Sequence, residues 1–167
     1  DITRLSKDAI THAPKSMNNP QFNMYNCNKL SIQLNLSQPQ GLELAKRLVC
    51  VSDVILENFS AGTLDRLGLS YPMVKSLNPG IVMVSASASG HSGPEAGMLG
   101  IAPIFVYLSG LAEMGGYGDG PPFEGRTSAD AINSFTLAYV ILASLWKQRQ
   151  TGKGQYIDHS SREGLAC

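Results

Sequence analysis

A nearly continuous apolar run at residues 81–87 most constrains what this chain can fold into. Its sequence is Ile-Val-Met-Val-Ser-Ala-Ser, and it follows the turn sequence Asn-Pro-Gly. This composition suits a parallel strand that is covered on both faces. A shorter apolar run at residues 54–56 precedes it, and a helical stretch that ends near Leu77 separates the two. Strands that alternate with helices predict an α/β protein with a Rossmann-like parallel sheet and flanking helices.

The rest of the chain extends this alternating pattern. Residues 30–36 alternate apolar and polar side chains, which is typical of a strand with one buried face. Residues 156–158 make a short last strand. Apolar side chains at three-residue and four-residue spacing and helix-capping residues predict further helices at residues 38–50, 60–67, 104–112 and 128–149. In the last of these, the recurring apolar residues are Ile132, Phe135, Tyr139, Leu142 and Trp146.

The organisation predicted from this pattern is one partial domain. Residues 1–23 are polar and show no sustained period, so we interpret them as a connecting segment. Residues 24–167 are predicted to form a partial Rossmann-like domain that is truncated at both ends. The whole chain has 167 residues, of which 43% are hydrophobic, enough for one buried core.

Composition and charge exclude several classes of function. Thirteen basic side chains balance thirteen acidic ones, and no run of like charge appears, which argues against a nucleic-acid surface. The longest mostly apolar stretch, residues 98–112, is too short to cross a bilayer, so we expect no membrane partner. The first residues carry no secretion signal, and a cytoplasmic protein is expected.

Metal and phosphate motifs do not occur in the sequence. Cys27, Cys50 and Cys167 form no C-x-x-C pair, and the three histidines form no H-E-x-x-H motif, so no metal site is expected. The glycine-rich stretch at residues 115–120 does not complete G-x-G-x-x-G, because Pro121 takes the place of the third glycine. Ligand-binding residues must therefore be sought at strand ends and helix starts.

Asn58, Phe59 and Arg66 form the first candidate site. Asn58 falls where the strand at residues 54–56 ends, which is where an α/β fold usually binds its ligand. Its amide can hydrogen-bond a ligand, and the Phe59 ring can stack on a planar group such as a purine. The alternative is an asparagine that caps a helix and a phenylalanine that belongs to the core.

Asp130 is the second candidate. It lies in the sequence Thr-Ser-Ala-Asp, predicted to open the long helix at residues 128–149. A carboxylate in a first helical turn is stabilised by the helix dipole, and free backbone N–H groups nearby can stabilise an oxyanion. The alternative is that Asp130 only caps its helix.

Six segments of the chain together carry a resemblance to a known family: residues 26–36, 52–69, 89–94, 108–111, 118–122 and 152–158. In this order they resemble the family III CoA-transferases (CaiB/BaiF type). The family includes formyl-CoA transferase, carnitine CoA-transferase and the 2-methylacyl-CoA racemases. Members of the family are more than twice as long as this chain, so the resemblance implies an internal fragment of the larger family III fold.

The resemblance implies an enzyme that transfers CoA between an acyl-CoA and a free carboxylic acid. Asp130 matches the catalytic aspartate, which forms an aspartyl anhydride with the donor and then an aspartyl-CoA thioester. Asn58, Phe59 and Arg66 match positions that hold coenzyme A, and Leu34 is a further match. Coenzyme A is thus implied as substrate and product, no metal is implied, and family members form interlocked homodimers.

Two other functions stay open at this point. The racemase branch uses a histidine after the glycine that precedes its helix, and this chain has Ile101 after Gly100. Isoleucine cannot transfer a proton, which favours CoA transfer, although His91 is a candidate for that role. The third possibility is a non-catalytic CoA-binding fragment in which Asp130 only caps its helix.

Overall fold

The computed structural model describes residues 20–123 and 126–166. The chain divides into two compact units, residues 1–33 and residues 34–167. In the first unit, the described part contains the short helix α2 (Pro20–Tyr25). Residues 1–19 of the predicted connecting segment lie outside the described residues, and α2 spans the predicted end of that segment. The domain boundaries therefore stay a prediction.

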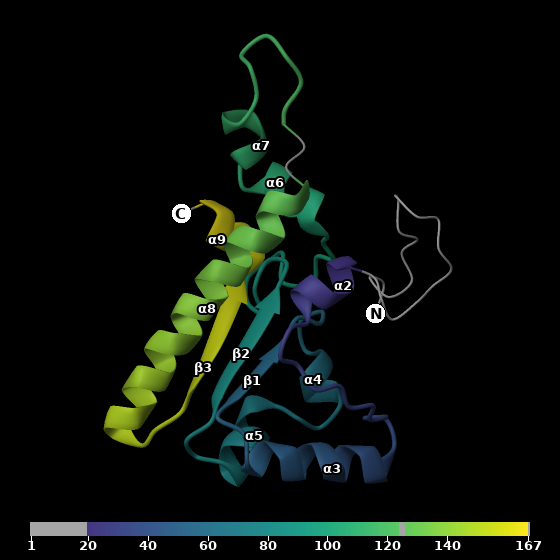
Figure 1. The fold of residues 1–167 in the computed structure, drawn as a ribbon, viewed down its shortest axis with the longest axis vertical. Helices are drawn as coiled ribbons and strands as arrows, with labels where there is room; N and C mark the ends of the chain where they lie inside the picture. Colours follow the sequence, from purple (N-terminus) through teal and green to yellow (C-terminus); the bar gives the residue numbers. More distant parts are fainter. Residues whose placement is uncertain (1–19, 124–125, 167) are drawn as a thin grey trace. The chain divides into compact units, whose positions relative to one another are not determined.

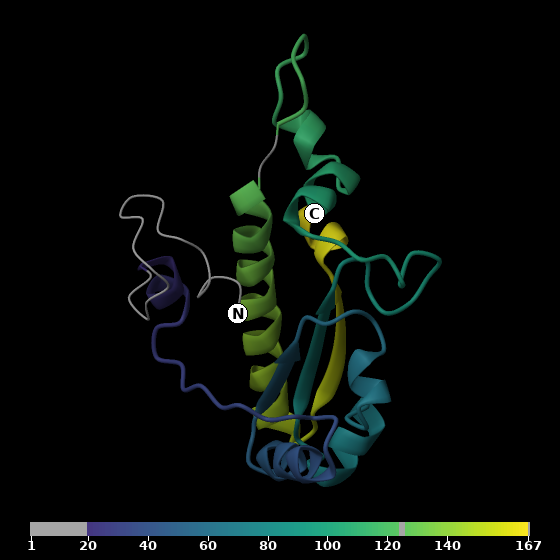
Figure 2. The ribbon, with the colours of Figure 1, turned by 90° about the vertical axis from the view of Figure 1, so that its right-hand side faces the viewer.

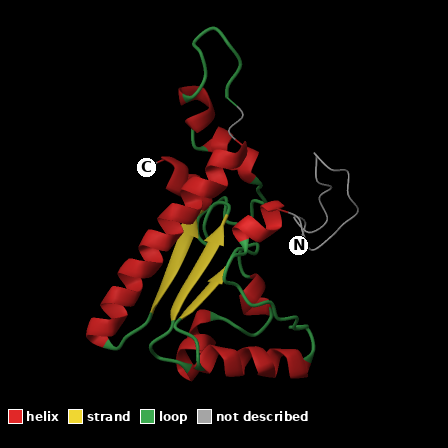
Figure 3. Ribbon diagram, viewed as in Figure 1, coloured by secondary structure: helices red, strands yellow, loops and turns green. Residues whose placement is uncertain are grey.

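A parallel sheet of three strands forms the centre of the second unit (Figure 3). The strands are β1 (Val54–Glu57), β2 (Val82–Ser87) and β3 (Gln155–Ser160), and they lie in the order β1-β2-β3. Every residue of β2 is buried, as expected for a strand with both faces covered. The predicted α/β fold with a parallel sheet and flanking helices is confirmed.

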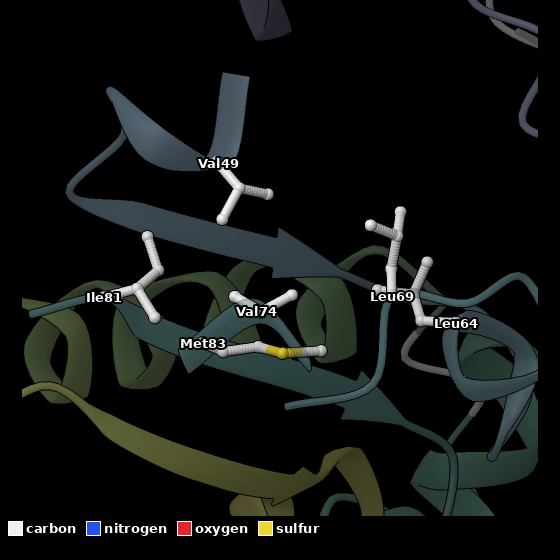
Figure 4. Packing of buried hydrophobic residues seen from close by; sticks show 6 residues of the cluster. All are labelled: Val49, Leu64, Leu69, Val74, Ile81 and Met83. Atoms are coloured by element: carbon white, nitrogen blue, oxygen red, sulfur yellow. The ribbon is translucent and has the colours of Figure 1, made fainter. Parts of the chain in front are cut away.

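Three helices and their loops cover one face of the sheet. They are α3 (Pro39–Cys50), α4 (Thr63–Arg66) and α5 (Tyr71–Leu77). Their apolar side chains meet Met83 of β2 in one buried cluster, which Figure 4 shows from close by. The six residues drawn there are Val49, Leu64, Leu69, Val74, Ile81 and Met83. α4 is shorter than the helix predicted at residues 60–67, because Gly62 at its start has a left-handed backbone (φ 74°).

The long helix α8 (Arg126–Thr151) runs along the opposite face of the sheet, as Figures 1 and 2 show. A hydrogen bond of 2.6 Å from Gln155 Nε2 to Ser144 Oγ joins it to β3. Its residues Ala129–Thr151 are long and apolar enough to cross a membrane by length and composition alone. In this structure one side of the helix packs on the sheet, but most of the stretch is not buried. It is longer than residues 98–112, so the prediction that those residues form the longest apolar stretch is wrong.

Three short helices lie at the carboxyl ends of the strands (Figure 1). They are α6 (Ala102–Leu108), α7 (Leu111–Met114) and α9 (Ser161–Ala166), and they enclose a small second core with the start of α8. The single helix predicted at residues 104–112 is wrong in this detail. Gly110 adopts φ 82°, a conformation that glycine adopts without strain, and this separates α6 from α7.

The strand predicted at residues 30–36 is absent. These residues have no regular secondary structure, Leu30 is fully exposed, and 66% of the Ile32 surface is exposed. Alternating side chains stabilise a strand only when a neighbouring strand supplies hydrogen bonds and a surface to cover. Among the described residues, β1 pairs only with β2, so this segment has no partner strand.

Candidate functional site

The carboxyl ends of the strands place a row of polar side chains on one face of the sheet. Glu57 pairs with Ser85, and Ser85 pairs with Asp158. Because alternate residues of a strand face opposite sides, these three side chains share the face covered by α4 and α5. They come from three segments far apart in the sequence. Ligands of open α/β sheets usually bind at this end of the strands.

Glu57 holds the turn that contains Asn58 and Phe59. The Phe59 backbone N–H donates a 2.7 Å hydrogen bond to Glu57 Oε2, and only 7% of Glu57 is exposed. The two residues that follow it are turned outward: Asn58 is exposed, and 48% of the Phe59 surface is exposed. Asn58 and Phe59 are thus available to a ligand, whereas the alternative of a core phenylalanine is wrong.

His91 lies above the row formed by Glu57, Ser85 and Asp158. Its backbone N–H donates to both carboxylate oxygens of Asp158, each at 2.9 Å. In the His91 ring, Nδ1 lies 3.4 Å from the Tyr156 hydroxyl, and Nε2 lies 3.7 Å from Glu57 Oε1. His91 therefore connects the loop after β2 to both neighbouring strands. Gly90 just before it adopts φ 81°, which lets the chain turn close to Asp158.

An open cavity of about 380 Å³ lies beside this cluster. Its wall contains His91, Ser85 and two tyrosines, Tyr71 and Tyr156, whose ring centroids are 5.3 Å apart. Burial raises the pKa of both tyrosines. For Tyr156 a side-chain hydrogen bond with Ser85 lowers the pKa, and the carboxylates of Asp158, Glu57 and Asp65 raise it, so the net direction is upward. Both phenols are therefore protonated at neutral pH, so the Tyr156 hydroxyl can donate to His91 Nδ1.

Arg66 follows Phe59 by seven residues, whereas Leu34 precedes Asn58 by 24 residues. Arg66 ends α4, and its exposed guanidinium donates a 2.9 Å hydrogen bond to Thr63 Oγ1 and a weaker 3.5 Å bond to the Ala61 carbonyl. This leaves further N–H donors of the guanidinium for a phosphate. Leu34 is half-buried in the segment that precedes α3. Arg66 thus lies on the same connection as Asn58 and Phe59, whereas Leu34 comes from a different one.

Asp130 lies near the start of α8, at the carboxyl end of the sheet. The helix begins at Arg126, two residues earlier than predicted, so Asp130 is its fifth residue and not part of its first turn. Side chains cap a helix from positions before or within the first turn, so this position does not support the capping alternative. The prediction that Asp130 belongs to the first turn is wrong as well, because the backbone N–H groups left free by the helix are those of the four residues before it. Asp130 is exposed, and no other described residue bonds its carboxylate.

The helix turn around Asp130 is firmly held. Ala129 is fully buried, and Asn133, one turn later, is buried with its Oδ1 atom 3.2 Å from His159 Nε2. The sequence patterns do not reveal this contact or the positions of Glu57, Tyr156 and Asp158 in the site. The only signal for them was that Glu57, Tyr156 and Asp158 lie inside the segments that carried the resemblance. In the described part of the chain, no group of His, Cys, Asp and Glu side chains could hold a metal ion.

Comparison with known proteins gives one consistent result. The sequence model described as CoA-transferase family III matches residues 2–166. The succinyl-CoA–L-malate CoA-transferase alpha subunit of Chloroflexus aurantiacus is 38% identical over 133 residues, which are 78% of this chain and 31% of that protein. The formyl-CoA:oxalate CoA-transferase of Streptomyces coelicolor is 37% identical over 140 residues, or 82% of this chain and 33% of that protein.

A solved structure agrees with the sequence comparisons. The crystal structure of a CaiB/BaiF family protein from Brucella suis superposes with a TM-score of 0.77 at 33% identity. The match covers 81% of this chain and 36% of that protein. The chain thus spans about a third of the length of the relatives it matches.

Proposed function

The chain belongs to CoA-transferase family III, and from that premise we propose that it transfers CoA between an acyl-CoA thioester and a free carboxylic acid, with Asp130 as the nucleophile. The observation that carries this proposal is the placement of Asp130. Its carboxylate is exposed, while its helix turn is held by the buried residues Ala129 and Asn133. A nucleophile fixed in this way loses little conformational freedom when it reacts.

The proposed reaction proceeds through two kinds of covalent intermediate on Asp130. A carboxylate oxygen of Asp130 attacks the thioester carbonyl carbon, the C–S bond breaks, and CoA leaves as the thiolate. The thiolate then attacks the aspartyl carbonyl carbon of the mixed anhydride, which releases the donor acid and leaves an aspartyl-CoA thioester. The acceptor carboxylate then attacks the aspartyl-CoA carbonyl carbon, which releases the CoA thiolate and forms a second mixed anhydride. The thiolate attacks the acceptor's acyl carbon, which forms the new acyl-CoA and regenerates the Asp130 carboxylate.

Asn58, Phe59 and Arg66 are the proposed CoA-binding residues, with Leu34 as a further contact. The Asn58 amide and the exposed Phe59 ring suit hydrogen bonding and stacking with the adenine, and the Arg66 guanidinium suits a CoA phosphate. The substrates proposed are a short acyl-CoA and a small carboxylic acid, because the matched relatives are named for succinyl-CoA with malate and for formyl-CoA with oxalate.

The relatives favour transfer over racemisation. Ile101, which takes the place of the racemase histidine, is exposed just before α6 and has no proton to transfer.

A cytoplasmic location and a homodimer stay predictions, and light scattering of the complete protein tests the dimer.

Trapping of the acyl-enzyme tests the proposed mechanism. The complete protein is incubated with succinyl-CoA or formyl-CoA, hydroxylamine is added, and peptide mapping by mass spectrometry locates any hydroxamate. We expect the hydroxamate at Asp130 in the wild type and none in Asp130→Asn. Asp53→Asn is the matched control, because Asp53 is also exposed but lies at the amino end of β1. CoA binding without a hydroxamate for any donor would support the non-catalytic alternative.

A further inference from the structure

Glu57 is a buried carboxylate whose one hydrogen bond among the described residues goes to a backbone amide of the candidate CoA-binding turn. Its side chain is only 5% exposed, and Oε2 accepts the Phe59 N–H at 2.7 Å. Removing a carboxylate from water is unfavourable, and one hydrogen bond compensates it only in part. An apolar residue would bury more favourably at this point of the sheet. The carboxylate therefore has a role other than filling the core.

The hydrogen bond sets the direction of the Asn58 and Phe59 side chains. The bond joins the Glu57 side chain to the backbone N–H two residues later, so the chain turns sharply where β1 ends. Both side chains then lie exposed on the outside of the turn. Without an acceptor at Glu57, the Phe59 amide loses its bond, and the turn has no other described hydrogen bond to hold this conformation.

His91 and Asp158 hold Glu57 from the other side. The Asp158 carboxylate fixes the His91 backbone with two 2.9 Å contacts, and this places His91 Nε2 3.7 Å from Glu57 Oε1. That nitrogen is buried and has no hydrogen bond of its own in the described residues. If Tyr156 donates to Nδ1, then Nε2 carries the ring proton and faces the Glu57 carboxylate. An N–H dipole at this nitrogen attracts the Glu57 carboxylate and so stabilises its position.

From this arrangement we propose that Glu57 is a positioning residue, which holds the Asn58–Phe59 turn in the conformation that binds CoA. This inference rests on the proposed function, because it assumes that the turn contacts CoA. Glu57 itself touches no substrate, since its side chain is buried beneath the turn. Asp158 and His91 support it from β3 and from the loop after β2.

Substitutions of Glu57 in the complete protein test the proposal, with coenzyme A as the probe in calorimetric titrations. Glu57→Ala removes the acceptor, and we expect the Kd for CoA and the KM for acyl-CoA to rise about tenfold while kcat changes little. Glu57→Gln keeps a carbonyl oxygen for the Phe59 N–H, and we expect it to restore the Kd to within about threefold of the wild type. Equal losses in Glu57→Gln and Glu57→Ala would overturn the proposal.

A control and a second measurement separate positioning from loss of stability. Val84→Ala also removes buried side-chain atoms, but Val84 lies on the opposite face of β2 and should leave the Kd unchanged. Hydrogen exchange of the Phe59 amide is measured in parallel, and Glu57→Ala should exchange at least tenfold faster there than the wild type. If the wild type does not bind CoA, the proposed function fails, and this exchange result still decides whether Glu57 holds the turn. An unchanged exchange rate in Glu57→Ala would overturn the proposal on its own.

Discussion

His159 Nε2 lies 3.2 Å from Asn133 Oδ1, and this buried contact joins the end of β3 to the helix that carries Asp130. Asn133 follows Asp130 by three residues, so the two lie almost one turn apart on α8. The Gly164 backbone on α9 packs against the same pair, because a Cβ atom there would lie 2.8 Å from Asn133 Oδ1. The position of the proposed nucleophile thus depends on a buried histidine whose pKa burial lowers.

Acidification is expected to destabilise the protein through His159. Burial lowers the pKa of His159 below its ordinary value of 6.5, and the nearby Asp158 and Glu163 oppose this only in part. The unfolded chain therefore binds a proton that the folded chain does not, and stability is lost as the pH falls below about 6.5. Urea unfolding at pH 7.5 and pH 5.5 measures this loss. His159→Gln keeps a donor for Asn133 but cannot titrate, so its loss should be smaller, and an equal loss would contradict the assignment.

Gly154→Ala is expected to be strongly destabilising. The Gly154 N–H donates to the Pro79 carbonyl at 2.9 Å, and an added Cβ would overlap the Ile81 carbonyl oxygen. Because backbone cannot move aside easily, the start of β3 must shift from β2, at a cost of about 3 kcal/mol. Gly97→Ala is the control, since its Cβ meets no atom within 4 Å and should change stability by less than about 0.5 kcal/mol. Chemical denaturation that gives the same midpoint for both variants would refute this account.

Arg66→Ala is expected to weaken CoA binding about tenfold, or about 1.4 kcal/mol, if the guanidinium contacts a phosphate. The bond to Thr63 Oγ1 orients the guanidinium and leaves other donors in a fixed fork. Arg66→Lys keeps the charge but not the fork, so it should recover only part of the affinity. The wild-type Kd should also rise with salt concentration more steeply than that of Arg66→Ala. Arg149→Ala, at the far end of α8, serves as the control and should bind CoA like the wild type.

The sequence predicted the sheet well for the segments that the structure pairs as strands. The run at residues 81–87 contains a strand that is buried on both faces. Ile55 in the run at residues 54–56 packs on the same cluster as Met83, although Leu56 beside it is 53% exposed. The equally regular pattern at residues 30–36 is not a strand, since periodicity describes one segment and cannot show whether a partner exists. The local pattern of apolar residues therefore predicted a strand correctly only where a neighbouring strand pairs with that segment.

The candidate site was predictable only in part, for a related reason. Asn58 and Phe59 follow a strand end, which the sequence shows directly, and the structure leaves both accessible. Glu57, His91 and Asp158 lie up to 101 residues apart in the sequence and meet only because three parallel strands end together. No spacing rule links such residues before the strand order is known. Whether Asp130 reacts stays a prediction, which the trapping experiment tests.

The exposed apolar side of α8 leads to a last prediction, about the chain on its own. The residues that recur at three-residue and four-residue spacing on this helix face outward, whereas its buried residues in the described part are small or polar: Ala129, Asn133 and Ser144. Four large side chains on the outer side are between 66% and 78% exposed: Phe135, Tyr139, Leu142 and Trp146. An apolar row of this kind is rare on monomeric soluble proteins and promotes association.

We therefore expect residues 1–167 to self-associate at micromolar concentration when expressed alone. Size-exclusion chromatography with light scattering should give masses well above the 17.9 kDa of the chain. The double variant Leu142→Gln and Trp146→Gln should shift the mass toward 17.9 kDa with little change in stability, because both side chains are largely exposed. Leu99→Gln is the matched control: Leu99 is 73% exposed but lies in a loop and not on α8, so this variant should associate like the wild type. A monodisperse wild type at the monomer mass would show that the row does not drive association. Equal effects of Leu99→Gln and the double variant would show that association depends on exposed apolar side chains in general and not on this row.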